Sequence, residues 1–220
     1  MTLHRPESLD AALALLAEGG VLLAGGTDVY PALRDGAPPA RMIDVSRVAG
    51  LRGIARQEGL WRIGGATTWS DVIRADLPPA FDGLKLAARE VGSVQIQNAG
   101  TVAGNICNAS PAADGMPALL TLDAEVEVTG ADGVRRVPLA EFVRGVRQTD
   151  LRAGEIVTAL LIPDAPGQGA FLKLGARKYL VISIAMVAAL VETSDGVLSR
   201  AAVAVGACSP VARRLPALEA

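Results

Sequence analysis

Two short stretches of this chain combine glycine with small, neutral polar side chains. The first, AGGTD, ends an apolar run over residues 21–24 and contains Gly25, Gly26 and Thr27. Glycine lets the backbone approach a ligand closely, and backbone N–H groups beside a threonine hydroxyl suit phosphate oxygens. The same residues also suit a plain tight turn after a strand, so this stretch alone leaves both interpretations open.

The second stretch lies in the middle of the chain. Residues 93–128 place small polar groups between apolar ones, at Asn98, Gly100, Thr101, Gly104, Asn105, Asn108, Ser110 and Asp114. Such a surface offers uncharged donors to a phosphate or a sugar. The alternative is a turn-rich β segment whose Asn and Asp residues cap their own backbone. If both stretches bind one ligand, they form two short phosphate loops.

Several familiar motifs are missing from the sequence. It has no G-x-x-x-x-G-K-[ST], no G-x-G-x-x-G opening a helix and no G-x-S-x-G, which argues against a P-loop, a Rossmann site and a hydrolase nucleophile. His4 is the only histidine, which excludes a histidine-based triad. Cys107 and Cys208 form no C-x-x-C pair, which excludes the usual zinc and iron–sulfur ligand sets. Cys107 is expected to be a small buried apolar residue.

Composition limits the class of protein. Of 220 residues, 50% are apolar and only 3% aromatic, so Ala, Val, Leu and Ile must build the core. The net charge is −2 and no basic stripe is visible, which argues against nucleic acid as a partner. The N-terminus lacks a leader pattern, and the longest apolar run, residues 179–191, is too short to span a bilayer. We therefore expect a cytoplasmic protein without a membrane span.

The elements that must position the first stretch follow from capping residues and apolar periodicity. Ser8 is predicted to cap a helix that ends near residue 18. Short strands are predicted over residues 21–24 and 41–46, and a short helix is expected to follow AGGTD. The alternation of strands and helices favours a small, mostly parallel sheet.

From about residue 53 the pattern becomes antiparallel. Three hairpins are predicted, with turns at Glu58-Gly59, Asp132-Gly133 and Asp195-Gly196. Helices are predicted over residues 70–75 with Ser70 as the cap, over 80–91, and after Asp114. The Pro- and Gly-containing residues 161–170 are the predicted domain boundary.

Several motifs, taken together in order, resemble one family. They are AGGTD at residues 24–28, GTVAGNICNASPAAD at 100–114 and FLKLGARKYLVIS at 171–183, supported by HRPESLDAALALLAEGG and IGGATTWSDV. They are similar to the FAD-binding medium subunits, or flavin domains, of the molybdenum hydroxylases. That family includes xanthine dehydrogenase and aerobic carbon monoxide dehydrogenase, and the resemblance covers essentially the whole chain.

The resemblance implies an α+β fold of the vanillyl-alcohol oxidase type. Residues 1–165 would form a two-lobed FAD-binding domain, with a small N-terminal α/β lobe over residues 1–52 and a larger lobe with an antiparallel sheet over 53–165. FAD would lie extended between the lobes. Residues 166–220 would be part of a C-terminal α+β domain, which is expected to be incomplete.

The resemblance also implies a set of FAD-binding residues and no catalytic or metal-binding residues. The set is Leu22, Leu23, Ala24, Gly25, Gly26, Thr27, Asp28, Val29, Thr101, Val102, Ala103, Gly104, Asn105, Asp114, Val157 and Lys173. The chain departs from the family pattern at three positions. Ala103 replaces a usual glycine, Gln97 a common arginine, and Val181 a common aspartate. A Cβ at position 103 is costly only if φ there is positive.

The function that the resemblance implies is electron transfer. Electrons from a molybdenum-cofactor large subunit would pass through [2Fe–2S] clusters on a small subunit to FAD on this chain, and then to NAD, oxygen or a quinone. The protein would position the cofactor, which performs the redox chemistry. Two alternatives remain: a self-contained FAD-dependent oxidoreductase, like the reductase that makes UDP-N-acetylmuramate, and a cofactor-free assembly or binding protein.

Overall fold

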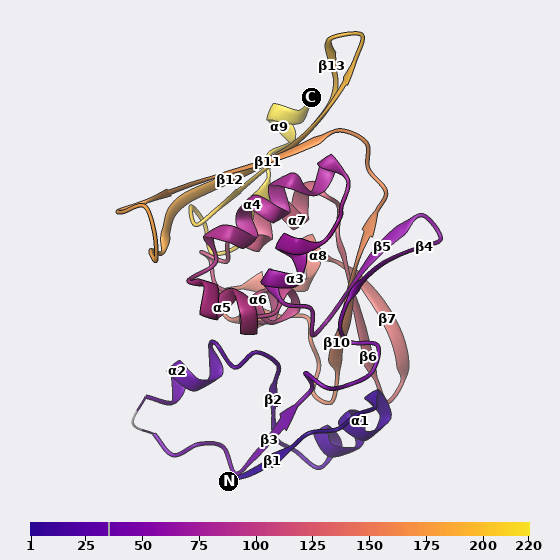
Figure 1. The fold of residues 1–220 in the computed structure, drawn as a ribbon, viewed down its shortest axis with the longest axis vertical. Coiled ribbons are helices and arrows are strands. Elements are labelled where there is room, and N and C mark those ends of the chain that lie inside the picture. The colour runs from indigo at the N-terminus through magenta and orange to yellow at the C-terminus, as the bar shows by residue number, and fades with distance from the viewer. Residues whose placement is uncertain (35) are drawn as a thin grey trace.

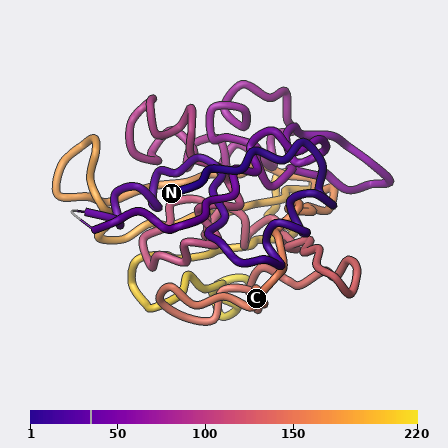
Figure 2. The backbone as a smooth tube through the Cα atoms, turned by 90° about the horizontal axis from the view of Figure 1, so that it is seen from below, coloured from indigo at the N-terminus to yellow at the C-terminus, as the bar shows by residue number. Residues whose placement is uncertain are grey.

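The N-terminal part of the chain is a small lobe built on a parallel sheet. In the computed structural model, which describes residues 1–34 and 36–220, three strands pair in the order β1-β3-β2, and both pairings are parallel. The elements of this lobe are β1 (Thr2–His4), α1 (Leu9–Ala17), β2 (Val21–Leu23), α2 (Val29–Leu33) and β3 (Arg41–Asp44). Figure 1 shows the lobe at the bottom of the molecule, and Figure 2 views the molecule from that side.

Local capping and a small apolar cluster hold this lobe together. The Ser8 hydroxyl accepts a hydrogen bond from the Ala11 amide at 3.2 Å, which confirms Ser8 as the cap of α1. Ala12 on α1 and Ile43 on β3 are fully buried. The cluster extends to Ala66 and Ile156, which belong to the second lobe, so the two lobes are joined through apolar contacts.

The second lobe contains a five-stranded antiparallel sheet. Its strand order is β4-β5-β10-β6-β7, and the central strand β10 is buried along nearly its whole length. The strands are β4 (Ile54–Gln57), β5 (Leu60–Gly64), β6 (Glu125–Gly130), β7 (Gly133–Pro138) and β10 (Ile156–Pro163). This arrangement confirms the predicted larger lobe with an antiparallel sheet.

A layer of short helices lies between the small lobe and a third sheet (Figure 1). The helices are α3 (Trp69–Arg74), η1 (Pro79–Phe81), α4 (Asp82–Glu90), α5 (Val94–Ala99), α6 (Val102–Asn108) and α7 (Gly115–Thr121). The third sheet has the order β11-β12-β13-β14, from β11 (Gln168–Gly175), β12 (Ser183–Ser194), β13 (Val197–Gly206) and β14 (Arg213–Arg214). One apolar core runs through the five-stranded sheet, the helices and the inner face of this third sheet.

Short elements complete the chain. They are α8 (Leu139–Phe142), β8 (Val143–Gly145), β9 (Gln148–Thr149) and α9 (Pro216–Glu219). The strands β8 and β9 form a separate two-stranded hairpin. Its tip reaches α6, where the Arg147 amide donates to the Ala109 carbonyl at 2.9 Å.

Two local predictions are wrong in detail. The cap of α3 is Thr68, not Ser70. The Thr68 hydroxyl accepts a hydrogen bond from the Asp71 backbone amide, and the Asp71 carboxylate accepts one from the Thr68 backbone amide. The second hairpin turns at Ala131 and Asp132, because Gly133 already pairs with Gly130.

Candidate functional site

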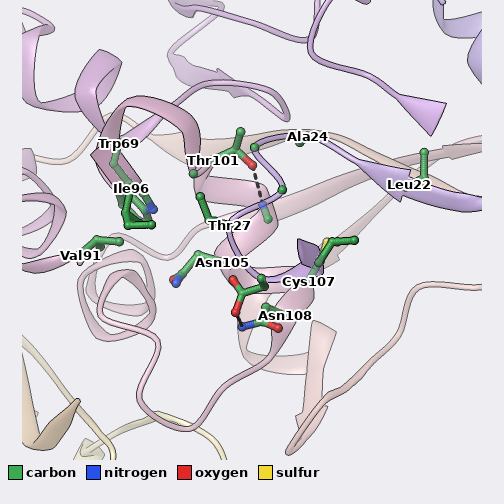
Figure 3. Close-up of a pocket in the computed structure, with 16 residues that line it drawn as sticks. Leu22, Ala24, Thr27, Trp69, Val91, Ile96, Thr101, Asn105, Cys107 and Asn108 are labelled. Carbon is green, nitrogen blue, oxygen red and sulfur yellow. Dashed lines mark hydrogen bonds between the residues drawn. The ribbon is translucent and has the colours of Figure 1, made fainter. Parts of the chain in front are cut away.

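A cavity of about 460 Å³ lies where the loop after β2 meets helices α5 and α6. Ten of the predicted binding residues line it: Leu22, Ala24, Gly25, Gly26, Thr27, Asp28, Val29, Thr101, Gly104 and Asn105. The structure therefore brings the two glycine-containing stretches together in the wall of one cavity (Figure 3).

The first stretch depends on its two glycines for different reasons. A Cβ on Gly25 would lie 1.9 Å from the Ala99 carbonyl oxygen, so only glycine permits this contact between the lobes. Gly26 has a φ of +69°, and a Cβ there would also meet the Tyr30 ring at 2.6 Å. The backbone thus passes close to the second lobe and then turns sharply into α2.

The second stretch is the start of a helix, not an extended loop. The Thr101 hydroxyl accepts a hydrogen bond from the Gly104 amide at 3.0 Å and caps α6 (Figure 3). The helical spacing puts Thr101, Gly104, Asn105 and Asn108 on the face toward the cavity. The alternative of a turn-rich β segment is therefore wrong for residues 102–108.

Ala103 carries no strain in this helix. It lies within α6, its φ is not positive, and its side chain is buried in the core with only 4% exposed. The helix therefore accommodates the extra Cβ that distinguishes this chain from the family pattern. Gln97 also has a structural role, because its amide donates to the Arg89 and Val91 carbonyls at 3.0 and 3.1 Å.

One side chain on the cavity wall has an unmet hydrogen-bonding requirement. The Asn105 side-chain oxygen is buried and has no hydrogen-bond partner among the residues that the structure describes. A buried acceptor of this kind is costly unless a ligand or water donates to it. The position therefore suits a ligand that carries hydroxyl groups.

The loop after β2, residues 24–28, is called the first loop below, and it is also bonded to the second lobe. The Asn108 side-chain amide donates to the Asp28 carboxylate at 2.8 Å, the bond drawn at Asn108 in Figure 3. Thr27 lies against Gly100, where an added Cβ would sit 3.2 Å from the Thr27 hydroxyl oxygen. The walls of the cavity are thus in direct contact.

A second cavity of about 360 Å³ contains Asp114. It adjoins the first along the chain, because Val91 and Asn108 line the first while Gly92 and Ser110 line the second. Val181, at the family's aspartate position, also lines this second cavity.

Asp114 is held by two side chains from the third sheet. Lys173 on β11 pairs with its carboxylate at 3.1 Å, and the Ser183 hydroxyl donates to it at 2.8 Å. Burial raises the pKa of Asp114, while the Lys173 ammonium and the Ser183 hydrogen bond oppose that rise. The Lys173 ammonium also donates to the Glu90 carbonyl at 3.3 Å.

The remaining predicted residues lie in the core. Leu23, Val102, Ala103 and Val157 are buried and line neither cavity. Their side chains therefore support the walls, and any contact with a ligand would come from their backbone. These assignments stay predictions.

Six residues that line the first cavity are outside the predicted set: Trp69, Val91, Ile96, Gly100, Cys107 and Asn108. Asn108 and Gly100 stood in the stretch rich in small polar residues, and a helical period through Thr101 and Gly104 would have indicated Asn108. Trp69 and Ile96 had no local signal, because packing of α3 against α5 brings them to the wall. Burial raises the pKa of the Cys107 thiol to about 12, so it is protonated at neutral pH.

Other classes of site have no support in the described residues, 1–34 and 36–220. No group of three or more His, Cys, Asp or Glu side chains there is placed to hold a metal ion. No helix in that part of the chain is long and apolar enough to cross a membrane.

Comparison with known proteins gives consistent matches. A family model described as the FAD binding domain in molybdopterin dehydrogenase matches residues 1–165. The chain is 35% identical to the nicotinate dehydrogenase FAD-subunit of Eubacterium barkeri, over 81% of this chain and 64% of that protein. It is 34% identical to the xanthine dehydrogenase FAD-binding subunit of Escherichia coli O157:H7, over 94% of this chain and 74% of that protein.

A solved structure shows the same fold. A reconstituted CO dehydrogenase from Oligotropha carboxidovorans superposes with a TM-score of 0.91 at 28% identity, covering 97% of this chain and 77% of the other. The agreement extends through the small lobe, the helical layer and both large sheets.

Proposed function

Because this chain belongs to the FAD-binding domain family of the molybdopterin dehydrogenases, we propose that it is the electron-transfer flavoprotein subunit of such an enzyme. It would receive electrons from [2Fe–2S] clusters on a small partner subunit, which are reduced by a molybdenum-cofactor large subunit. It would deliver them to an acceptor such as NAD, oxygen or a quinone. We also propose the cytoplasm as its compartment, which fits the two unpaired cysteines.

The single observation that carries this proposal is the cavity shared by the two lobes. Its walls provide half-buried backbone at Gly25 and Gly26, the Thr27 hydroxyl, and an Asn105 oxygen that has no partner among the described residues. Backbone N–H groups and hydroxyls suit a diphosphate, and a buried amide oxygen suits a ribose or ribityl hydroxyl. The residues present therefore fit FAD.

The second cavity supports an extended cofactor. Its lining residues follow those of the first cavity in sequence, at residues 91–92 and 108–110, and they include Asp114. Asp114 can accept hydrogen bonds from hydroxyl groups, and Lys173 and Ser183 fix its orientation. FAD carries a ribityl polyol joined directly to its diphosphate, so an extended FAD with its diphosphate in the first cavity would place hydroxyl groups near the second.

The chain's own residues would bind and orient the cofactor. FAD, when bound, supplies the redox chemistry that links one-electron and two-electron partners. No group of catalytic acids and bases lines the described walls of the first cavity, where Asp28 is the one carboxylate and it is bonded to Asn108. This arrangement favours an electron-transfer role over a self-contained enzyme that must protonate its own substrate.

The proposal is tested with the purified chain and with its partners. FAD should give a yellow complex with a flavin absorption spectrum, and it should quench the fluorescence of Trp69, which lines the cavity. No bound flavin after addition of FAD would contradict the proposal and favour the cofactor-free alternative. Co-purification with molybdenum and iron–sulfur subunits is expected, whereas turnover of a substrate by the isolated flavoprotein would favour the self-contained enzyme.

A further inference from the structure

Asp28 places a carboxylate on the wall of a cavity that otherwise suits an anion. A negative charge beside a diphosphate weakens binding unless the carboxylate is otherwise engaged. The orientation of Asp28 therefore needs a structural reason, and its neighbour in the same wall supplies one.

Asp28 does not use its side chain locally. It is the residue before α2, a position where Asp commonly caps its own helix, yet it makes no side-chain cap bond there. Its carboxylate instead accepts a hydrogen bond at 2.8 Å from the Asn108 amide, across the two lobes.

Asn108 is itself held in place from the far side. It is the last residue of α6, and Ala109 ends that helix in the left-handed conformation with φ +46°. The Arg147 guanidinium donates to the Asn108 carbonyl at 3.2 Å, and the Arg147 amide donates to the Ala109 carbonyl at 2.9 Å. The donor that meets Asp28 is therefore fixed to the second lobe before any ligand binds.

We propose that Asn108 is a positioning residue which, through Asp28, holds the first loop closed on α6 and so forms the diphosphate cradle in advance. The inference rests on the proposed FAD-binding function. A preformed cradle costs less ordering when the cofactor binds, and the bonded carboxylate is engaged with a neutral donor. Asp28 thus affects cofactor binding by holding the first loop in position.

The test compares variants of the pair with a matched control. Asn108→Ala and Asp28→Ala each remove the bond, and the exchanged pair Asp28→Asn with Asn108→Asp restores a donor facing an acceptor. Asn98→Ala is the control, because Asn98 lies on neighbouring α5 and bonds to Ser70, and it does not line the cavity. Two quantities are measured: hydrogen exchange of the amides of residues 26–30 without FAD, and the Kd for FAD from fluorescence quenching.

We expect both single variants to exchange the loop amides roughly tenfold faster, as for loss of one charge-assisted hydrogen bond. Asn108→Ala, which keeps the Asp28 charge, should bind FAD roughly tenfold more weakly, whereas Asp28→Ala, which also removes that charge, should lose less affinity. The exchanged pair should recover most of the protection of the loop amides and most of the affinity for FAD. Asn98→Ala should change neither the amide exchange nor the affinity. Unchanged loop exchange in Asn108→Ala would overturn the inference, as would weaker FAD binding that the exchanged pair does not rescue. Failure of the unmodified chain to bind FAD would count against the proposed function, while the exchange comparison would still decide whether the pair holds the loop.

Discussion

At the scale of single residues, the site depends on the absence of a side chain at Gly25. Its backbone lies so close to the Ala99 carbonyl that a Cβ would sit at 1.9 Å, well inside van der Waals contact. The obstructing atom belongs to backbone and cannot rotate away. The first loop and α5 can therefore be neighbours only with glycine at this position.

Gly25→Ala is expected to push the loop away from α5, lowering the free energy of unfolding by about 1–3 kcal/mol and weakening FAD binding at least roughly tenfold. Thermal melting and a fluorescence titration measure the two effects. Gly145→Ala is the matched control, since its new Cβ would meet only the end of the Gln148 side chain at 3.2 Å. Equal effects of the two substitutions would contradict the close-approach argument.

The buried Asp114–Lys173 pair makes a second prediction at this scale. Lys173→Met leaves an ionised carboxyl without its cation, which costs about 3 kcal/mol at neutral pH. Burial already raises the pKa of Asp114, and loss of Lys173 raises it further. Relative to the unmodified chain, the variant therefore loses least stability at acid pH, where the Asp114 carboxyl is neutral, and loses more as pH rises through that pKa.

Denaturant unfolding of Lys173→Met and of the unmodified chain between pH 4 and pH 8 checks this sign, because that range runs from about the ordinary Asp pKa to about four units above it. Adding Asp114→Asn should flatten the pH dependence, because the titrating group is gone. A double variant that keeps the same slope would show that another group is responsible.

At the scale of elements, side-chain caps decide where the helices begin. Ser8, Thr68, Ser93 and Thr101 each accept a hydrogen bond from a backbone amide in the first turn. The cap at Ser8 was predictable because an apolar helical pattern follows it. The helices after Ser93 and Thr101 were not predicted, because Gly, Asn and Gln within them weaken the local helical signal.

Hairpin turns were likewise predictable from local residues, whereas the pairing of distant strands was not. Glu58-Gly59 and Asp195-Gly196 form the predicted turns, and all four residues have positive φ. The pairing of β10 between β5 and β6 had no local signal, because it depends on contacts across the whole lobe. Likewise, the sequence motifs predicted both walls of the cavity, whereas Trp69 and Ile96 required the packed structure.

Thr101→Ala is expected to destabilise the chain by about 1 kcal/mol, because the Gly104 amide loses its acceptor at the start of α6. Thr101→Ser keeps the hydroxyl and should retain most of that stability. Chemical denaturation of the two variants measures the difference. Equal loss in both would assign the effect to the methyl group of the buried Thr101 side chain and contradict the capping role.

At the scale of the whole molecule, two cores of unequal size share the chain. The large core joins the five-stranded sheet, the helical layer and the third sheet, whereas the small lobe has its own minor cluster around Ala12 and Ile43. The small lobe is therefore the less independently stable part. A ligand in the cavity between the lobes adds contacts to both of them.

FAD is accordingly expected to stabilise the whole chain against heat. At a free concentration of one hundred times its Kd, binding to the folded state adds about 2.7 kcal/mol, which corresponds to a Tm increase of roughly 5–11 °C for a chain of this size. Differential scanning calorimetry at several FAD concentrations measures the shift. A Tm that does not depend on FAD concentration would exclude binding at the folded-state cavity.

Strand β10 gives the lobes a second point of attachment, because consecutive residues of it belong to different cores. Ile156 packs in the small-lobe cluster and Val157 in the large core. The first loop is attached to the same second lobe by the Asp28–Asn108 bond and by the close approaches of Gly25 to Ala99 and of Thr27 to Gly100. Attachments at both the strand and the loop oppose a hinge motion of the small lobe. The width of the cavity is therefore set by the folded chain itself.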